Sequence, residues 1–388
     1  MTCLDGGIPV SIRPPRDRMV YDRVRRALRK SWICARAVAL APLHLRTLRR
    51  IRPPTAPSIR RLLVVRTDRL GDMALTTVAL QDLRQHFRKA KITVLAPPAP
   101  LALLESHPSV DRRVELTDAG LPDELVGRFD LAIDFTPADP LRGALLVART
   151  RAPLRAGFRG GGREVFFNIR APHSNRRRHL IDRNRDLLEA LGVPPFARFP
   201  KLVVTAEEAE RARSRLAALG AAAPRVTVHP GGHYPSQRWS PECYADLVTL
   251  LTGHSAAACI VLSGPGEEPE VHRICASTPD ALSTGPLTVR ELMAVLAVCD
   301  LFVGNNSGPL HIAGALGVPT VSVMGPTDPE RFSPRGIDDR VVRHDLPCSP
   351  CDRGRCWHHT CLRGIEPVEV DRAAREALCR PAAREAAR

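Results

Sequence analysis

Short apolar runs alternate with amphipathic stretches along most of this sequence. The run at 61–66 (RLLVVR) is typical of a buried strand, and the apolar positions that follow it recur at helical spacing as far as residue 87. Further strand–helix pairs of this kind lie at 225–251 and 301–323. Because strands that alternate with helices are joined as crossover units, the pattern predicts an α/β protein with parallel sheets.

The same criteria predict the remaining elements. Strands are expected at 91–95, 129–135, 154–158 and 258–262, and helices at 141–149, 179–191, 206–219 and 368–378. The predicted domains are residues 61–205 and residues 206–388, each with a parallel sheet of its own.

The first 60 residues depart from this alternation and carry most of the charge. The 388-residue chain has a net charge of +16, and residues 1–60 account for +11 of it, with fourteen Lys and Arg against three Asp. Residues 1–18 are rich in Gly, Pro and Arg, which predicts disorder, while residues 19–50 have a helical pattern that Pro42 interrupts. Residues 1–60 are therefore predicted to be a basic, partly disordered extension with helical segments.

Three kinds of partner fit this extension. An amphipathic, arginine-rich helix can lie on an anionic membrane surface, and a solvated basic extension explains the pattern equally well. Nucleic-acid binding is the third, but no binding motif accompanies the charge, so no specific nucleic-acid partner is expected. No apolar run reaches transmembrane length, and the eleven cysteines do not form a disulfide-type framework. These features favour a cytoplasmic protein, peripheral on the inner face of the cytoplasmic membrane if the extension docks there.

The stretch from 301 to 323 carries the clearest binding chemistry. Asn306-Ser307-Gly308 combines turn and helix N-cap residues between a predicted strand and a helix that Gly317 closes. The free N–H groups and positive dipole end of such a helix attract anions, and α/β proteins bind phosphates at the carboxyl edge of the sheet. An ordinary strand-to-helix turn with a capping serine would look the same.

Two further loops of the second predicted domain have nucleotide-type chemistry. Gly231 and Gly232 follow the strand at 225–229, with Arg238 shortly after, as in a phosphate-binding loop. Glu268 follows the strand at 258–262 and is suited to hold a ribose diol, with the neighbouring Glu267 as the alternative. Three such loops on one sheet edge favour a nucleotide site over coincidence.

The first predicted domain contributes a carboxylate. Asp72 follows Gly71 at the turn between the strand at 61–66 and the next helix, at the carboxyl edge of the predicted sheet. A carboxylate there can take a proton from a hydroxyl as a general base, or it can cap the helix. Residues 159–178, rich in Gly and Arg, are expected to be a mobile basic loop that either meets an anionic acceptor or is solvated.

These motifs resemble those of glycosyltransferase family 9, the heptosyltransferases of lipopolysaccharide core assembly. The resemblance covers roughly residues 61–370 and rests on VVRTDRLGDMALTT, AIDF, RAGF, HPGGHYPSQRW, GNNSGPLHIAGALGVPTV and GPTDP in that order. It implies the GT-B fold, with two facing Rossmann-like domains and parallel sheets. It also implies inverting transfer of a heptose or related sugar from an ADP-sugar to a hydroxyl of a lipopolysaccharide core or another envelope glycan.

The resemblance assigns a role to each matching residue. Asp72 is implied as the general base on the acceptor hydroxyl, Glu268 as the ribose ligand and Leu287 as the residue at the adenine. The implied donor- and phosphate-binding residues are Arg69, Gly231, Gly232, Gln237, Arg238, Asn306, Ser307, Gly308 and His311. The implied partners are a nucleotide-sugar donor and a glycolipid or glycan acceptor, and no cofactor or metal is required by this scheme.

The sequence departs from the family pattern at two positions. Asn306 stands where the family often has Asp, and Gln237 stands where it often has Lys. Arg238 is positioned to supply the missing cation, and in a bidentate way that Lys cannot; otherwise donor affinity is weakened or the donor differs. A catalytically impaired nucleotide-binding protein, a transferase for a different acceptor and a basic adaptor driven by residues 1–60 stay open. The sugar and the acceptor are not named by the sequence.

A cysteine-rich segment lies near the end of the chain. Residues 348–361 contain four cysteines and two histidines, namely Cys348, Cys351, Cys356, Cys361, His358 and His359. Thiolates and imidazoles in such density can bind zinc or an iron–sulfur cluster. The spacing is not that of a standard zinc finger, and family members often carry a similar loop. A structural loop without metal is therefore the favoured prediction.

Overall fold

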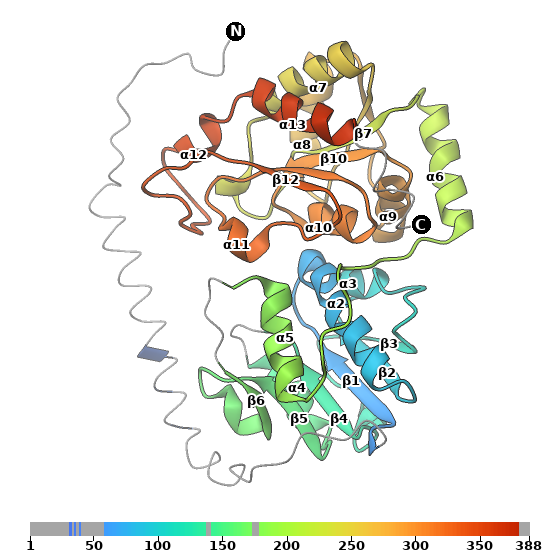
Figure 1. Cartoon of the computed structure of the whole chain (residues 1–388), viewed down its shortest axis with the longest axis vertical. Helices are drawn as coiled ribbons and strands as arrows, with labels where there is room; N and C mark the ends of the chain where they lie inside the picture. Colours follow the sequence, from blue (N-terminus) through green and yellow to red (C-terminus); the bar gives the residue numbers. More distant parts are fainter. Residues whose placement is uncertain are drawn as a thin grey trace. The chain divides into compact units, whose positions relative to one another are not determined.

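A computed structural model of the chain describes residues 58–136, 141–172 and 178–379, together with Ser31, Trp32, Ala35 and Ala39. The predictions of disorder and helix within residues 1–57 lie outside the described residues, apart from those four positions. The chain divides into two compact units, one ending at Arg198 and the other beginning at Phe199. They are called the N-terminal unit and the C-terminal unit below, and each has a sheet of its own (Figure 1).

The N-terminal unit is built on a six-stranded parallel sheet with the order β3-β2-β1-β4-β5-β6. Its strands are β1 (Arg61–Val65), β2 (Lys91–Ala96), β3 (Arg112–Glu115), β4 (Leu131–Asp134), β5 (Leu154–Phe158) and β6 (Ile169–Ala171). Its helices are α2 (Leu70–His86), α3 (Pro98–Ala102), α4 (Arg142–Arg149) and α5 (Leu180–Ala190), with short 3₁₀ turns η2 (Asp123–Leu125) and η3 (Arg163–Phe166).

The C-terminal unit repeats this plan with the order β12-β11-β10-β7-β8-β9, again all parallel. Its strands are β7 (Arg225–His229), β8 (Ala258–Val261), β9 (Ala281–Ser283), β10 (Leu301–Asn305), β11 (Thr320–Val323) and β12 (Asp339–Val342). Its helical elements are α6 (Ala206–Ala218), η4 (Pro235–Gln237), α7 (Pro241–Ser255), α8 (Glu268–Ser277), α9 (Val289–Ala297), α10 (Gly308–Ala315), α11 (Pro329–Phe332), α12 (Thr360–Arg363) and α13 (Pro367–Leu378).

Both sheets have the doubly wound order of a Rossmann-like fold, which confirms the α/β prediction. In each unit the first strand lies beside the fourth, so successive crossovers run in opposite directions from that pair. The pairs are β1 and β4 in one unit, and β7 and β10 in the other. Ligands of open α/β sheets bind in the crevice at the carboxyl ends of such a pair, which locates the candidate site in each unit.

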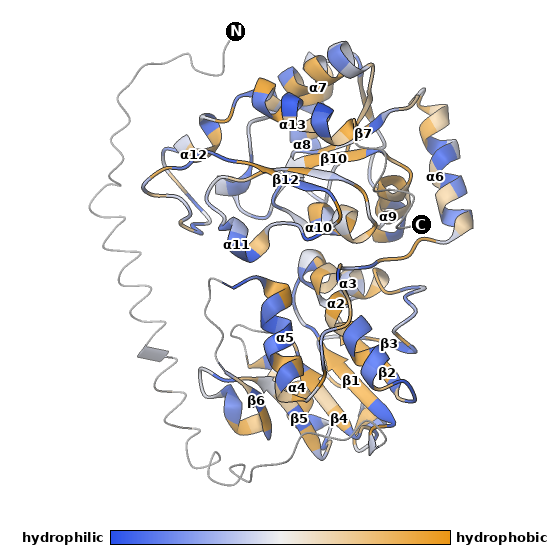
Figure 2. Cartoon of the chain, in the orientation of Figure 1, coloured by the Kyte–Doolittle hydropathy of each residue, from blue (hydrophilic) through white to orange (hydrophobic). Residues whose placement is uncertain are grey.

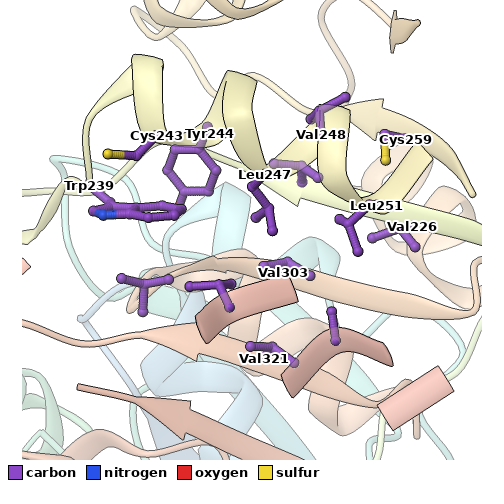
Figure 3. Close-up of a cluster of buried hydrophobic side chains, with 14 of the residues drawn as sticks. Val226, Trp239, Cys243, Tyr244, Leu247, Val248, Leu251, Cys259, Val303 and Val321 are labelled. Atoms are coloured by element: carbon purple, nitrogen blue, oxygen red, sulfur yellow. The ribbon is translucent and has the colours of Figure 1, made fainter. Parts of the chain in front are cut away.

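The apolar side chains that recur periodically in the sequence form the core of each unit. The central strands are apolar over their buried lengths, and the helices present apolar faces to them (Figure 2). In the C-terminal unit, α7 and α13 pack against each other on one face of the sheet. Leu247 and Leu251 of α7 point from the helix toward Val303 and Val321 of the strands (Figure 3), and all four are fully buried. Burying each such side chain contributes about 1.5–3 kcal/mol.

The structure corrects two local predictions. Helix α2 begins at Leu70, so Asp72 lies inside its first turn and not at a turn before it. The segment 159–178 was expected to be a mobile loop, but it contains η3 and β6, and β6 pairs with β5. Residues 173–177 of that segment lie outside the described part. Within the part of the chain that the structure describes, no helix is both long and apolar enough to cross a membrane.

Candidate functional site

The crevice between β1 and β4 in the N-terminal unit is organised by Arg66, which follows β1. Its side chain is completely buried, and its Nη1 donates to the carbonyl of Phe135, just beyond β4. Its Nη2 lies 3.2 Å from Oδ2 of Asp68 and 3.4 Å from Oδ1 of Asp72. The guanidinium therefore ties the ends of the two strands together and holds two carboxylates at the crevice.

Asp72 takes part in capping helix α2, which is one of the two roles that the sequence left open. Its Oδ2 accepts a hydrogen bond of 3.3 Å from the backbone N–H of Arg69, the N-cap residue of α2. Its Oδ1 faces the buried Arg66, and 26% of the side chain is exposed. A carboxylate that is held by a helix start and a fixed cation, yet reachable from outside, is suited to accept a proton from a substrate hydroxyl.

Asp68 has a different electrostatic environment from Asp72. Burial raises the pKa of Asp68 to about 6, Arg66 opposes the rise, and the carboxylates of Asp72 and Asp134 add to it. Carboxylates that lie close together repel each other, so the neighbouring charges and the loss of solvent both favour the protonated form of Asp68.

A buried ion pair lies at the end of β4. Asp134 is fully buried, and its Oδ2 lies 2.5 Å from Nη2 of Arg163 in η3. Its Oδ1 accepts from the backbone N–H of Thr136 at 2.9 Å. The pair anchors the arginine-rich segment after β5 to the sheet. The sequence analysis quoted Asp134 only within the AIDF motif, although a carboxylate inside an apolar strand signals a buried partner.

The crevice between β7 and β10 in the C-terminal unit is organised by Glu267, at the N-cap of α8. Its carboxylate accepts from the backbone N–H groups of Gly232 at 3.0 Å and Gly264 at 2.8 Å, and it lies 3.0 Å from Nε2 of His229. Burial alone would raise the pKa of Glu267, but the hydrogen bonds and the attraction of His229, with the two backbone donors, lower it to about 2. Glu267 is therefore an ionised acceptor at the centre of this crevice.

Glu267 also explains the glycines of the loop after β7. A Cβ at Gly231 would lie 2.0 Å from the Glu267 carboxylate, which leaves room only for hydrogen. Arg238 closes the loop, with Nε donating to the Gly232 carbonyl at 2.8 Å and Nη1 pairing with Glu270 at 3.0 Å. The glycine-rich loop that the sequence assigned to phosphate therefore encloses the Glu267 carboxylate.

The turn between β10 and α10 faces the same loop. Ser307 is the N-cap residue of α10, and its Oγ lies 3.2 Å from Nδ1 of His229. Asn305, the last residue of β10, is fully buried; its side chain accepts from the backbone N–H of Trp239 and donates to the carbonyls of Pro230 and Gly231. The helix start, with Gly308 as its first residue, is therefore fixed against the glycine loop.

The remaining predicted residues of this unit spread along the carboxyl edge. Gln237 donates from Nε2 to Oγ1 of Thr327 at 2.9 Å, in the loop after β11. Asn306 is half-buried at the turn, and His311 is buried within α10. Glu268 is exposed at the start of α8, whereas its neighbour Glu267 faces the glycine loop. Leu287 is half-buried, next to the N-cap of α9.

The predicted residues therefore fall into two groups. Arg69 and Asp72 lie in the N-terminal unit, and the others lie in the C-terminal unit. Sequence reasoning missed four residues that organise the two crevices, namely Arg66, Asp68, Asp134 and His229. A polar residue that directly ends an apolar strand, as Arg66, Asp134 and His229 do, is the signal that could have found them.

The cysteine-rich segment packs against the loop after β11. The backbone N–H groups of Cys351 and Asp352 donate to the carbonyl of Pro326, and Oγ of Ser349 donates to the carbonyl of Gly325. Burial, with the neighbouring cysteines, raises the pKa of the Cys361 thiol to about 11. In the described residues, no group of three or more His, Cys, Asp or Glu side chains is arranged to hold a metal ion. The hydrogen bonds from Ser349, Cys351 and Asp352 join the segment to the loop after β11.

Two Rossmann-like units, each with polar side chains gathered at its strand-order switch, place this chain in the GT-B class of fold. The model of glycosyltransferase family 9 (heptosyltransferase) matches residues 121–361, more than half of the chain. The chain therefore belongs to glycosyltransferase family 9 and is a glycosyltransferase.

Similar proteins include named heptosyltransferases. Lipopolysaccharide heptosyltransferase 3 of Escherichia coli K12 is 26% identical over 282 residues, which cover 66% of this chain and 80% of the relative. Lipooligosaccharide heptosyltransferase 2 of Campylobacter jejuni is 24% identical over 330 residues, covering 80% and 95%. Among solved structures, a family 9 glycosyltransferase of Veillonella parvula matches with a TM-score of 0.71 at 21% identity, over 82% of this chain and 97% of that one. ADP-heptose lipopolysaccharide heptosyltransferase II of E. coli matches with a TM-score of 0.69 at 22% identity, covering 82% and 98%.

Proposed function

We propose that this enzyme transfers a heptose from ADP-heptose to a hydroxyl of a lipopolysaccharide core acceptor, with inversion at the anomeric carbon. The observation that carries the proposal is that each unit of this family 9 chain has polar groups at the carboxyl ends of its central strands. The N-terminal unit has a partly exposed carboxylate beside a buried cation, and the C-terminal unit has a helix start beside a glycine loop. The similarity to heptosyltransferases of lipopolysaccharide and lipooligosaccharide supports the choice of sugar and acceptor.

The acceptor side of the reaction is assigned to Asp72. The acceptor oxygen attacks the anomeric carbon while its proton passes to the Asp72 carboxylate. The bond between that carbon and the diphosphate oxygen breaks, and ADP leaves with the electron pair. Arg66 stabilises the ionised carboxylate before the transfer, and its fixed position keeps Asp72 in one orientation. Arg69 lies at the same helix start and is assigned to the sugar.

The donor side is assigned to the C-terminal unit. The N–H groups at the start of α10, with Ser307 and Gly308, are placed to bind the diphosphate and to offset charge on departing ADP. Arg238 makes its two observed bonds through Nε and Nη1, so Nη2 is assigned to the diphosphate. Glu268, exposed at the start of α8, is assigned to the ribose and Leu287 to the adenine. The scheme requires no cofactor.

A transfer assay tests the proposal. The enzyme is incubated with ADP-heptose and a heptose-deficient lipopolysaccharide core, and released ADP and extended acceptor are both measured. We expect Asp72→Asn to lower kcat by about 10²–10⁴-fold with little change in KM for the donor, because it removes the base but no donor contact. Asp123→Asn, an exposed aspartate that pairs with Arg149 in the same unit, is the matched control and should keep full activity. Absence of ADP release with every ADP-, GDP- and UDP-sugar tried would overturn the proposal.

We further propose that the enzyme works in the cytoplasm, on the inner face of the cytoplasmic membrane, where a glycolipid acceptor is presented. Support comes from the charge of residues 1–60, which hold +11 of the net +16. A basic segment of this size is attracted to anionic lipid by about 1 kcal/mol for each Lys or Arg near the surface. Binding of the enzyme to vesicles that contain anionic lipid tests this assignment.

A further inference from the structure

We propose that Glu267, His229 and Ser307 form a proton relay that couples diphosphate binding at the start of α10 to uptake of a proton by His229. The three side chains form one hydrogen-bonded series at the carboxyl ends of β7 and β10 in the C-terminal unit. Nε2 of His229 lies 3.0 Å from Glu267, and Nδ1 lies 3.2 Å from Oγ of Ser307. The inference rests on the proposed function, because it takes the diphosphate of the donor to bind at Ser307 and Gly308.

The hydrogen bonds assign the proton positions when the crevice is empty. Glu267 already accepts from two backbone N–H groups and is ionised, so it can only accept from the ring. Nε2 of His229 therefore carries a proton. In the neutral ring Nδ1 is then an acceptor, and the hydroxyl of Ser307 donates to it. In this state the outward side of Oγ presents lone pairs, which repel an anion.

A second proton on His229 reverses the direction of the hydrogen bond between its ring and Ser307. Nδ1 becomes a donor to Oγ of Ser307, and the hydroxyl hydrogen is released to donate outward to a phosphate oxygen. In this arrangement Ser307 donates a hydrogen bond to the phosphate, beside those from the N–H groups at the start of α10, and keeps its bond to Nδ1. A ligand that binds one protonation state more tightly shifts the equilibrium toward it, so an anion should draw a proton onto His229.

The surroundings of the ring favour a positive charge once the diphosphate is bound. His229 is 4% exposed and stacks on the Phe302 ring, with a centroid separation of 6.5 Å. The Glu267 carboxylate is in contact with the ring, and Arg238, which bonds to the same glycine loop, is paired with Glu270. Burial raises the pKa of Tyr244, so the phenol in the core below is neutral. An imidazolium would therefore lie between the Glu267 carboxylate and the bound diphosphate.

The relay assigns His229 as a positioning residue that acts through Ser307. As ADP departs, negative charge grows on the diphosphate, and the hydrogen bond from Ser307 strengthens. The imidazolium behind the hydroxyl supports that charge without direct contact with the substrate. Apart from the N–H bond that forms when Nδ1 takes up a proton from the solvent, no covalent bond is made or broken at His229 in this scheme.

Calorimetry tests the relay through proton linkage. Binding of ADP-heptose without acceptor is measured at about pH 8, where imidazoles are mostly neutral, in buffers of different ionisation enthalpy. A sugar diphosphate is a diester and does not titrate near neutral pH, so any proton uptake comes from the protein. We expect the wild-type enzyme to take up a substantial fraction of a proton on binding. We expect His229→Gln and Ser307→Ala to bind about 10-fold more weakly with the uptake abolished, because a charge-assisted hydrogen bond is lost.

A second histidine–carboxylate pair provides the matched control. Nδ1 of His254 on α7 lies 3.0 Å from Asp371 on α13, on the helical layer of the same unit. His254→Gln should leave both the affinity and the proton uptake at wild-type values. If His229→Gln does not fold, as judged by circular dichroism, Ser307→Ala decides the question, since it removes one partly exposed hydroxyl.

The outcomes separate the relay from the proposed function. Binding without proton uptake, or uptake that persists in His229→Gln and Ser307→Ala, would overturn the relay and leave heptosyl transfer intact. Failure of ADP-heptose to bind the wild-type enzyme would overturn the proposed donor and the relay together.

Discussion

At the residue scale, the buried guanidinium of Arg66 contacts two carboxylates that lie in different surroundings. The guanidinium reaches both Asp68 and Asp72 through Nη2, yet the two carboxylates differ in surroundings. Asp72 is bound to a helix start, whereas desolvation and the carboxylates of Asp72 and Asp134 raise the pKa of Asp68. A buried arginine without carboxylates would be costly, so at least one acid must stay ionised beside it.

The raised pKa of Asp68 predicts a pH-dependent stability. Because its pKa rises from 3.8 to about 6 on folding, the native state binds this proton more tightly, and stability falls as pH rises between those values. Asp68→Asn mimics the protonated side chain, so it should stabilise the protein at pH 8 by up to about 3 kcal/mol and give no gain at pH 4. Thermal melting followed by circular dichroism measures the difference. Asp118→Asn, at a fully exposed aspartate, should show no such pH trend; an equal gain at both pH values would contradict the argument.

At the scale of elements, the loop after β7 is shaped by the carboxylate that it encloses. Gly231 makes space for Glu267, Gly232 donates to it, and Arg238 closes the loop onto Glu270. Asn305 then joins this loop to the end of β10. In the proposed donor site, the strand end, the loop and the helix start are thus linked through direct contacts, and Glu267 lies at the centre of the loop's contacts.

A methyl group at position 231 should disturb this unit. Gly231→Ala places a Cβ 2.0 Å from the Glu267 carboxylate, so that the loop or the carboxylate must move. We expect a destabilisation of about 1–3 kcal/mol, as for overpacking of a core, and at least a 10-fold loss of ADP-heptose affinity. Gly253→Ala in α7 is the matched control, because no atom lies within 4 Å of its added Cβ. It should stabilise the helix by about 0.5–1 kcal/mol and leave affinity unchanged. Wild-type affinity in Gly231→Ala would show that Glu267 does not shape the donor site.

At the scale of the whole molecule, most of the net positive charge lies in a different part of the sequence from the proposed site residues. Residues 1–60 carry +11, while the two folded units together carry only +5. Both candidate crevices lie within the folded units, at Asp72 and Ser307. The extension is therefore suited to affect where the enzyme works and not how it reacts.

Removal of residues 1–57 should separate these two properties. We expect the truncated enzyme to lose binding to vesicles that contain anionic lipid, because most of the positive charge is gone. Its kcat on a water-soluble core oligosaccharide should stay within about two-fold of wild type, since no residue assigned to transition-state stabilisation is removed. Sedimentation with vesicles and the ADP-release assay measure the two effects. Undiminished vesicle binding would exclude the extension as the membrane anchor.

The sequence by itself determined the parallel α/β class, most element positions and the loops that carry binding chemistry. These are local properties, because apolar periodicity selects strand or helix, and Gly, Asn and Ser select turns and helix starts. The family motifs likewise pointed to Asp72 and to the turn at Ser307.

Only the tertiary structure decided which side chains meet. His229 and Ser307 are 78 residues apart, and His229 and Glu267 are 38 apart. They come together because β7 lies between β8 and β10, an order that local patterns do not encode. The same cause makes Glu267, not Glu268, the carboxylate that faces the glycine loop, and it buries Arg66 between two strand ends. Long-range pairing in a sheet depends on the packing of the whole unit, and that is why these partners could not be deduced from sequence alone.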